Sequence, residues 1–217
     1  MPPNVICVLP GETQEVIVIG AHTDKVSTAG DGVVDNWSGA SLLPSLLYSL
    51  SAQKRHHTFV FVGFAGEEEG MVGSEYYVEH LMPEDRARIE GMVNMDSLGL
   101  TTTKVWASHA DKELLDVLSS VAQASKLPVA PGNVDNIGTT DSESFATYHI
   151  PRITLHSVTA ENVQVLHSKN DTLSAINFED YYESYRLIAE YLACLDRVLT
   201  RGTAAAPIRA ALEKAMR

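Results

Sequence analysis

The hydrophobic residues of this chain alternate between two patterns. Short apolar runs with few polar interruptions are typical of buried strands, and longer stretches with apolar residues three and four positions apart are typical of amphipathic helices. Strand-like runs occupy residues 15–22, 57–65, 91–99 and 150–157, and residues 104–108 are a shorter candidate. Helical patterns occupy residues 38–53, 73–82, 112–125 and 178–200.

The order of these segments predicts the fold class. Strands that alternate with helices are typical of α/β proteins, in which helices cover both faces of a largely parallel sheet. We therefore expect an α/β fold with a mostly parallel mixed sheet sandwiched by helices. The 217 residues, of which 45% are hydrophobic, suffice for one domain, which we expect at residues 1–201. Residues 202–217 are expected to form a helical tail.

The first helical segment contains two local signals. Ser38 is a candidate N-cap for residues 38–53. Pro44 lies inside the apolar pattern and is expected to end, kink or delay the helix.

Polar side chains follow three of the predicted strands at the point where each strand ends. Ligands of open α/β sheets bind beyond the carboxyl ends of the strands, so we expect these side chains to lie close together. An acidic residue near the start of the first helix and a late loop add further candidates. The whole set is His22, Asp24, Asp35, Glu67, Glu68, Asp96 and His167.

Imidazole and carboxylate groups are the ligands that zinc prefers. A pair of zinc ions needs a bridging group, and a carboxylate has two oxygens. His22 and Asp24 are two positions apart on a strand and share a face, so Asp24 can orient the His22 ring. If one of Glu67 and Glu68 binds metal, the other can act as a general base. The arrangement is typical of metal-assisted hydrolysis of an amide.

Composition narrows the choice of partners. The formal net charge of −12 argues against nucleic acid or an anionic membrane as the main partner. No apolar run approaches the length of a membrane span. No signal peptide is visible at the N-terminus. The two cysteines, Cys7 and Cys194, form no metal-binding spacing or disulfide framework, and we expect both to be buried thiols.

Five motifs in this order resemble those of the M28 family of co-catalytic zinc peptidases: GAHTD, VVDNWSG, EEEGMVGS, VNMDSLG and LHSKNDT. The resemblance implies a zinc exopeptidase-like fold, peptide substrates and aminopeptidase activity with two zinc ions, for which manganese or cobalt could substitute. It implies that Asp35 bridges the ions, that Glu67 is the general base and that Asp24 orients His22. His22 and Asp96 would complete one metal site, and Glu68 and His167 the other. Asp171 is expected to brace the His167 loop.

The sequence departs from the family pattern at two places near the substrate. Ser142 stands where the similar segment of the family has a histidine, and Leu166 stands where some family aminopeptidases have a tyrosine that polarises the carbonyl. The substrate-binding residues therefore stay unassigned. The oligomeric state is also open, and the resemblance alone suggests a secreted or periplasmic location.

Several alternative functions remain. A glutaminyl cyclase-like or carboxypeptidase-like relative would use the same ligands, and a non-catalytic binding domain could share the scaffold. An M20-type amidohydrolase would need an inserted lid domain, for which the segment between Asp96 and His167 leaves no room.

Overall fold

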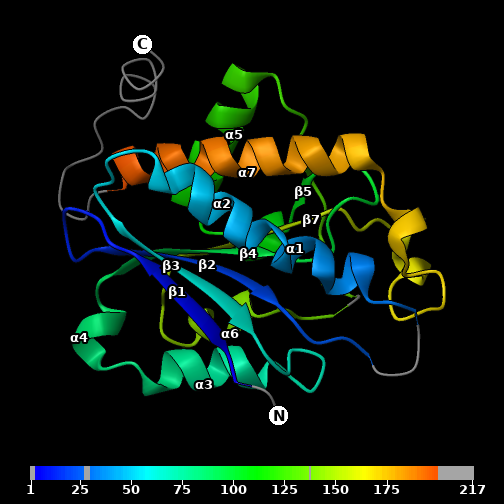
Figure 1. Cartoon of the computed structure of the whole chain (residues 1–217), viewed down its shortest axis with the longest axis horizontal. Helices are drawn as coiled ribbons and strands as arrows, with labels where there is room; N and C mark the ends of the chain where they lie inside the picture. Colours follow the sequence, from blue (N-terminus) through cyan, green and yellow to red (C-terminus); the bar gives the residue numbers. More distant parts are fainter. Residues whose placement is uncertain (1–2, 27–29, 137, 200–217) are drawn as a thin grey trace.

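A seven-stranded mixed sheet forms the centre of the computed structural model, which describes residues 3–26, 30–136 and 138–199 (Figure 1). The strand order is β1-β3-β2-β4-β7-β5-β6. The four strands β3, β2, β4 and β7 run parallel to one another, β1 pairs antiparallel with β3, and β5 pairs antiparallel with β7 and parallel with β6. The prediction of a mostly parallel mixed sheet is confirmed.

The predicted strands all form, and two more are present. The bounds are β1 Val5–Leu9, β2 Val16–His22, β3 Thr58–Phe64, β4 Ile89–Met95, β5 Lys104–Val105, β6 Ala130–Pro131 and β7 Arg152–His156. The hydrophobic pattern of the sequence did not predict β1 and β6. β6 has only two residues, and β1 is an edge strand whose apolar side chains are largely exposed, so neither has the pattern of a buried strand.

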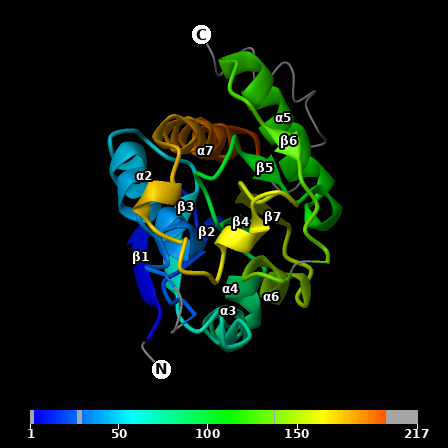
Figure 2. The same ribbon diagram turned by 90° about the vertical axis from the view of Figure 1, so that its right-hand side faces the viewer.

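Helices cover both faces of the sheet (Figures 1 and 2). One face carries α1 Ser38–Ala40, α2 Leu42–Ser51, α5 Lys112–Ser125 and α7 Phe178–Val198, and the other carries α3 Val72–His80, α4 Pro83–Arg86 and α6 Ser142–Ala146. The β2 side chains alternate between the two cores, since Ile17 and Ile19 pack with α2, α5 and α7, and Val18 packs with Val78 of α3. Both faces of β2 are therefore buried, which explains why its sequence is a continuous apolar run.

The segment after β2 differs in detail from the expectation. Ser38 lies inside α1 and is not an N-cap, because its hydroxyl donates to the carbonyl of Val34 at 2.7 Å and accepts from the Leu98 amide at 2.9 Å. Pro44 is the third residue of α2, where the absent N–H costs no helical hydrogen bond. The longer helix α2 thus begins only at Leu42, and a delayed start is one of the three outcomes that we expected from Pro44.

Three remaining expectations concern the periphery. Cys194 is buried, but Cys7 is exposed on the edge strand β1, so the expectation of two buried thiols was wrong for Cys7. The helical tail predicted for residues 202–217 lies outside the described residues. Among the described residues, no helix combines the length and apolar character needed to cross a membrane.

Candidate active site

The predicted polar side chains lie together at the carboxyl ends of three adjacent central strands. His22 is the last residue of β2, Asp96 follows β4, and Glu67 and Glu68 follow β3 after a turn at Gly66. Because β3, β2 and β4 are parallel neighbours, their ends lie side by side at one edge of the sheet.

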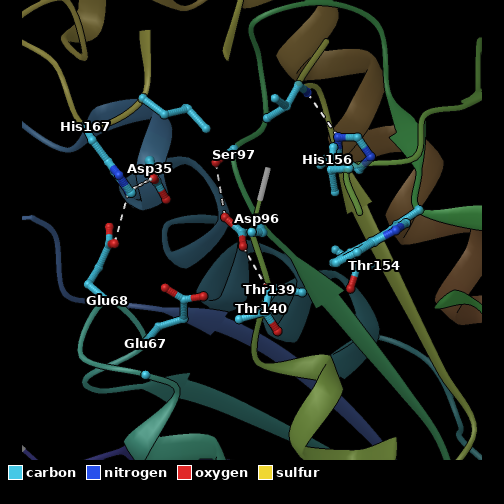
Figure 3. A pocket seen from close by; sticks show the side chains of 16 residues that line it. Asp35, Glu67, Glu68, Asp96, Ser97, Thr139, Thr140, Thr154, His156 and His167 are labelled. Atoms are coloured by element: carbon cyan, nitrogen blue, oxygen red, sulfur yellow. Dashed lines mark hydrogen bonds and ion pairs between the residues drawn. The ribbon is translucent and has the colours of Figure 1, made fainter. Parts of the chain in front are cut away.

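Loops supply the two other predicted ligands. Asp35 belongs to the kinked segment Val33–Trp37, where its own backbone angles are not helical (φ −118°, ψ 90°), and it is only 7% exposed. His167 comes from the loop before α7, where its backbone has a positive φ of 55°. Figure 3 shows Asp35, Glu68 and His167 converging on one side of the pocket, with Glu67 and Asp96 beside them.

Asp35 lies at the centre of the cluster. Its Oδ1 is 3.0 Å from His22 Nε2, and its Oδ2 is 3.0 Å from His167 Nε2. Each imidazole has a second acid nearby: Asp96 Oδ1 lies 3.5 Å from His22 Nε2, and Glu68 Oε2 lies 3.0 Å from His167 Nε2. The structure therefore brings together all five residues predicted as metal ligands, in two groups that share one carboxylate.

The two groups have the composition of metal sites. In each, one ligand atom from every residue lies within 4.8 Å of the others: His22, Asp35 and Asp96 form one group, and Asp35, Glu68 and His167 form the second. Imidazole nitrogen and carboxylate oxygen suit zinc, and three protein ligands with room for another are typical of a catalytic site. Glu68 Oε1 is buried without a hydrogen-bond partner, as a carboxylate oxygen reserved for a cation would be.

The electrostatics of the cluster also favour bound cations. Burial and the nearby charge of Asp96 raise the pKa of Glu67 to about 9. Burial and the charge of Asp35 likewise raise the pKa of Glu68. The hydrogen bond to Asp35 raises the pKa of His167 to about 9. Acids crowded to this degree resist ionisation, and positive charge placed among them relieves the repulsion. The residues thus fit a pair of divalent cations.

Asp24 contacts the loop of the two glutamates as well as His22, the residue that it was predicted to orient. Its carboxylate Oδ1 lies 3.7 Å from His22 Nδ1, while its backbone carbonyl oxygen is closer to that nitrogen, at 3.2 Å. The same carboxylate accepts the backbone N–H groups of Glu67 and Glu68, each at 3.2 Å. Asp24 therefore connects the end of β2 to the loop that carries both glutamates.

Asp171 positions the Asp35 segment. Its two carboxylate oxygens accept the backbone N–H groups of Val34 at 2.6 Å and of Asp35 at 3.2 Å. It was expected to brace the loop of His167. Its side chain reaches across to residues 34 and 35, so it ties that loop to the central carboxylate.

Sequence reasoning missed a further supporting residue, Thr140. Its hydroxyl donates to Asp96 Oδ2 at 2.7 Å and accepts from Asn94 Nδ2 at 2.7 Å. The only signal in the sequence is its place within the segment TTDSESF, residues 139–145, which resembles a segment of the family near the substrate. Ser142 itself is buried and is not among the residues that line the cavity, and its hydroxyl accepts from Thr154 Oγ1 at 2.8 Å.

A cavity of about 300 Å³ opens beside the acidic cluster. Its lining includes the carboxylates and the apolar residues Trp106, Val134, Val158 and Leu166. Thr154 and His156 also line it, on the side away from Glu68 and His167 in Figure 3. Leu166 thus adds an apolar side chain to the cavity at the position where some family aminopeptidases have a tyrosine.

Comparison with known proteins identifies the class. The fold is that of the zinc aminopeptidases: the zinc aminopeptidase BSAP from Bacillus subtilis matches with a TM-score of 0.79 at 21% identity, over 93% of this chain and 51% of that chain. A glutaminyl cyclase from an Acidobacteriales bacterium matches with a TM-score of 0.77 at 19% identity, over 89% of this chain and 73% of that chain.

The model of peptidase family M28 matches residues 4–192, and the chain belongs to that family. An aminopeptidase from Pseudomonas aeruginosa is 34% identical over 89 residues, which are 41% of this chain and 16% of that protein. The chain spans about half of the length of BSAP and a smaller part of the Pseudomonas relative. The predicted family and the zinc exopeptidase-like fold are confirmed, and the roles of the individual site residues stay predictions.

Proposed function

We propose that this chain is a metal-dependent aminopeptidase that removes N-terminal residues from peptides with two zinc ions. One observation carries the proposal: the two oxygens of Asp35 each lie 3.0 Å from a different histidine, and each histidine has its own second carboxylate. This is the ligand arrangement that a pair of bridged cations requires. Family membership and the fold of zinc aminopeptidases support it.

Asp35 would be shared between the ions, His22 and Asp96 would complete one site, and Glu68 and His167 the other. Bound there, the ions would supply Lewis acidity, which lowers the pKa of a water molecule to about 7 and polarises a carbonyl group. The mixed imidazole and carboxylate ligands favour zinc, and manganese or cobalt could substitute for it.

Glu67 would move the proton. Its side chain lines the cavity beside the ligands, and Asp24 holds its backbone N–H. Burial and the charge of Asp96 raise its pKa to about 9, and cations nearby would lower it from that value. A carboxyl poised in this way accepts a proton from the attacking water and returns it to the leaving amine.

The cavity favours an amino terminus over a carboxyl terminus. Four carboxylates line it, Asp35, Glu67, Glu68 and Asp96, and no described lining residue is Lys or Arg. A protonated or metal-directed amino group is attracted to such a site, whereas a carboxypeptidase needs a cation next to the scissile bond, where it binds the terminal carboxylate of the substrate. The carboxypeptidase-like alternative is therefore less well supported.

A glutaminyl cyclase-like activity is the second candidate, because a solved protein of that name shares the fold. It would release ammonia from a peptide with N-terminal glutamine and leave the peptide bonds intact. A non-catalytic binding domain is the weakest alternative, since every position of the ligand set is occupied by a residue that can bind metal.

The test combines metal content with turnover. We expect about two zinc ions per purified chain and hydrolysis of aminoacyl p-nitroanilides. Glu67→Gln should lower kcat by about 10²- to 10⁴-fold with the metal content retained, because only proton transfer is lost. The matched control is Glu69→Gln, which alters an exposed neighbour and should keep normal turnover.

Three results would contradict the proposal: full activity in Glu67→Gln, a chain that binds no zinc, or ammonia release from N-terminal glutamine without peptide cleavage. The last result would establish the cyclase alternative.

A further inference from the structure

A second groove adjoins the main cavity and differs from it in charge. It is lined by Lys104, Pro131, Gly132, Asn133, Val134, Asn136, Val158, Thr159 and Ala160. Val134 and Val158 also line the main cavity, so the two spaces share a wall. The main cavity has four carboxylates and no Lys or Arg among its described lining residues, whereas this groove has one lysine and no carboxylate among them.

Lys104 lines the adjoining groove and lies next to a residue of the main cavity. It is paired with His156 across the antiparallel strands β5 and β7, and His156 lines the main cavity. Residues paired in this way lie about 5 Å apart and project from the same face of the sheet. Gly132 lies between the two side chains, since a Cβ built there would be 3.0 Å from Lys104 Cβ and 3.2 Å from His156 Cε1.

The ammonium group of Lys104 has a hydrogen-bond acceptor but no paired carboxylate among the described residues. Its Nζ donates to Thr102 Oγ1 at 3.0 Å, and no carboxylate of the described residues forms an ion pair with it. An ammonium group has three N–H donors, so two remain for a ligand. The side chain is half-buried, which strengthens its attraction for an anion relative to a fully exposed lysine.

We propose that Lys104 binds a carboxylate of the substrate and makes this chain selective for carboxylate-bearing peptides. This inference rests on the proposed function, because the carboxylate belongs to the peptide that would be cleaved. The carboxylate has two sources: the acidic side chain of the N-terminal residue, or the free C-terminus of a short peptide. In both cases the amino end of the substrate meets the acidic cluster, and its negative group meets Lys104 beyond Val134 and Val158.

The experiment compares substrates that differ only in one carboxylate. One pair is glutamyl against glutaminyl p-nitroanilide, which tests the side chain. The other pair is Leu-Gly-Gly against its C-terminal amide, which tests the free terminus. The zinc-loaded protein is assayed as the unaltered chain and as Lys104→Met, Lys104→Arg and Lys104→Glu. Lys54→Met is the control, because it removes the same charge from an exposed position outside this groove.

We expect one of the two pairs to show a lower KM for the acid than for its neutral partner in the unaltered chain. The ratio of the two KM values should fall by about 10-fold in Lys104→Met, as for the loss of one hydrogen bond to a charged group. It should be largely retained in Lys104→Arg, reversed in Lys104→Glu and unchanged in Lys54→Met. The pair that responds identifies the source of the carboxylate.

A binding measurement separates this inference from the proposed function. Calorimetry with zinc-loaded Glu67→Gln measures the affinity for the same peptide acids and amides without turnover. If no substrate is cleaved but the acid binds more tightly in a manner that depends on Lys104, the proposed function fails and the carboxylate site stands. If Lys104→Met leaves both the KM ratio and the binding preference unchanged, or impairs neutral and acidic substrates equally, the carboxylate site is refuted.

Discussion

Individual residues in the active site depend on partners that are distant in sequence. Asp96 is held by Thr140, whose hydroxyl donates to Oδ2 at 2.7 Å, and Thr140 is in turn held by Asn94. The chain of two hydrogen bonds fixes Oδ2 of Asp96, while Oδ1 accepts from the Ser97 hydroxyl at 3.1 Å and lies 3.5 Å from His22 Nε2. Thr140 is therefore a positioning residue for a predicted metal ligand.

Thr140→Val should weaken metal binding without abolishing the fold. The substitution leaves Asp96 without one donor and Asn94 without one acceptor, and loss of such supporting contacts typically lowers metal affinity by about 10- to 100-fold. Zinc titration against a competing chelator measures the effect. Thr140→Ser keeps the hydroxyl and should remain within about 3-fold of the unaltered chain, which separates the hydrogen bond from the volume of the side chain. Equal zinc affinity in the valine and serine variants would refute the positioning role.

At the scale of elements, the turn between β3 and α3 sets the position of both glutamates. α3 begins close against the end of β3, and Gly73 makes the contact. A Cβ at Gly73 would lie 2.3 Å from the carbonyl oxygen of Ala65 and 2.4 Å from Asn4 Oδ1. Glu67 and Glu68 lie in the turn between these two contact points, so the close approach also fixes the active site.

Gly73→Ala should destabilise the protein by about 1–3 kcal/mol, because the backbone of β3 cannot move away from the added methyl group. Urea unfolding measures the change. Gly138→Ala is the control: a Cβ there meets nothing within 4 Å, and the free energy of unfolding should stay within about 0.5 kcal/mol. If the two variants unfold at the same urea concentration, the packing argument is wrong.

For the molecule as a whole, a buried charged cluster connects the sheet to its longest helix. His57 has no exposed surface, its Nε2 is 2.9 Å from Glu90 Oε2, and its Nδ1 is 3.2 Å from Asp196 Oδ1 on α7. Burial alone would lower the pKa of His57, but the hydrogen bonds with Asp196 and then with Glu90 outweigh it and raise the pKa. The cluster is thus most favourable with a protonated imidazole.

This cluster predicts a pH dependence of stability. A raised pKa means that the folded state holds the proton more tightly than the unfolded state, so the contribution of His57 is complete below its unfolded pKa of about 6.5. It is lost as the pH rises from there through the higher folded pKa. The free energy of unfolding should be measured between pH 5.5 and 9 for the unaltered chain and for His57→Gln, both with chelator present.

The difference in stability between the two proteins should be largest near pH 5.5 and shrink as the pH rises. The chelator keeps the metal state of the active site equal in both, so the difference reports His57 alone. A difference that stays constant or grows with pH would show that the imidazole is buried in its neutral form.

What the sequence by itself determined was the central strands, the longer helices and the convergence of the predicted ligands at one edge of the sheet. Burial on both faces makes the central strands continuous apolar runs, and the carboxyl ends of parallel strands meet, so His22, Glu67 and Asp96 were readable as neighbours. The motifs of the family predicted that Asp35 and His167 join the same site. These inferences succeed because they depend on local pattern and on the one edge that parallel strands share.

Only the tertiary structure decided the contacts that join segments far apart in the chain. The reach of Asp171 to the backbone of Asp35, the support of Asp96 by Thr140, and the pairing of Lys104 with His156 all cross more than forty residues of sequence. The exposure of Cys7 and the inward hydroxyl of Ser38 belong to the same class. Such contacts depend on the register and packing of whole elements, and a linear pattern of hydrophobic and polar residues contains neither.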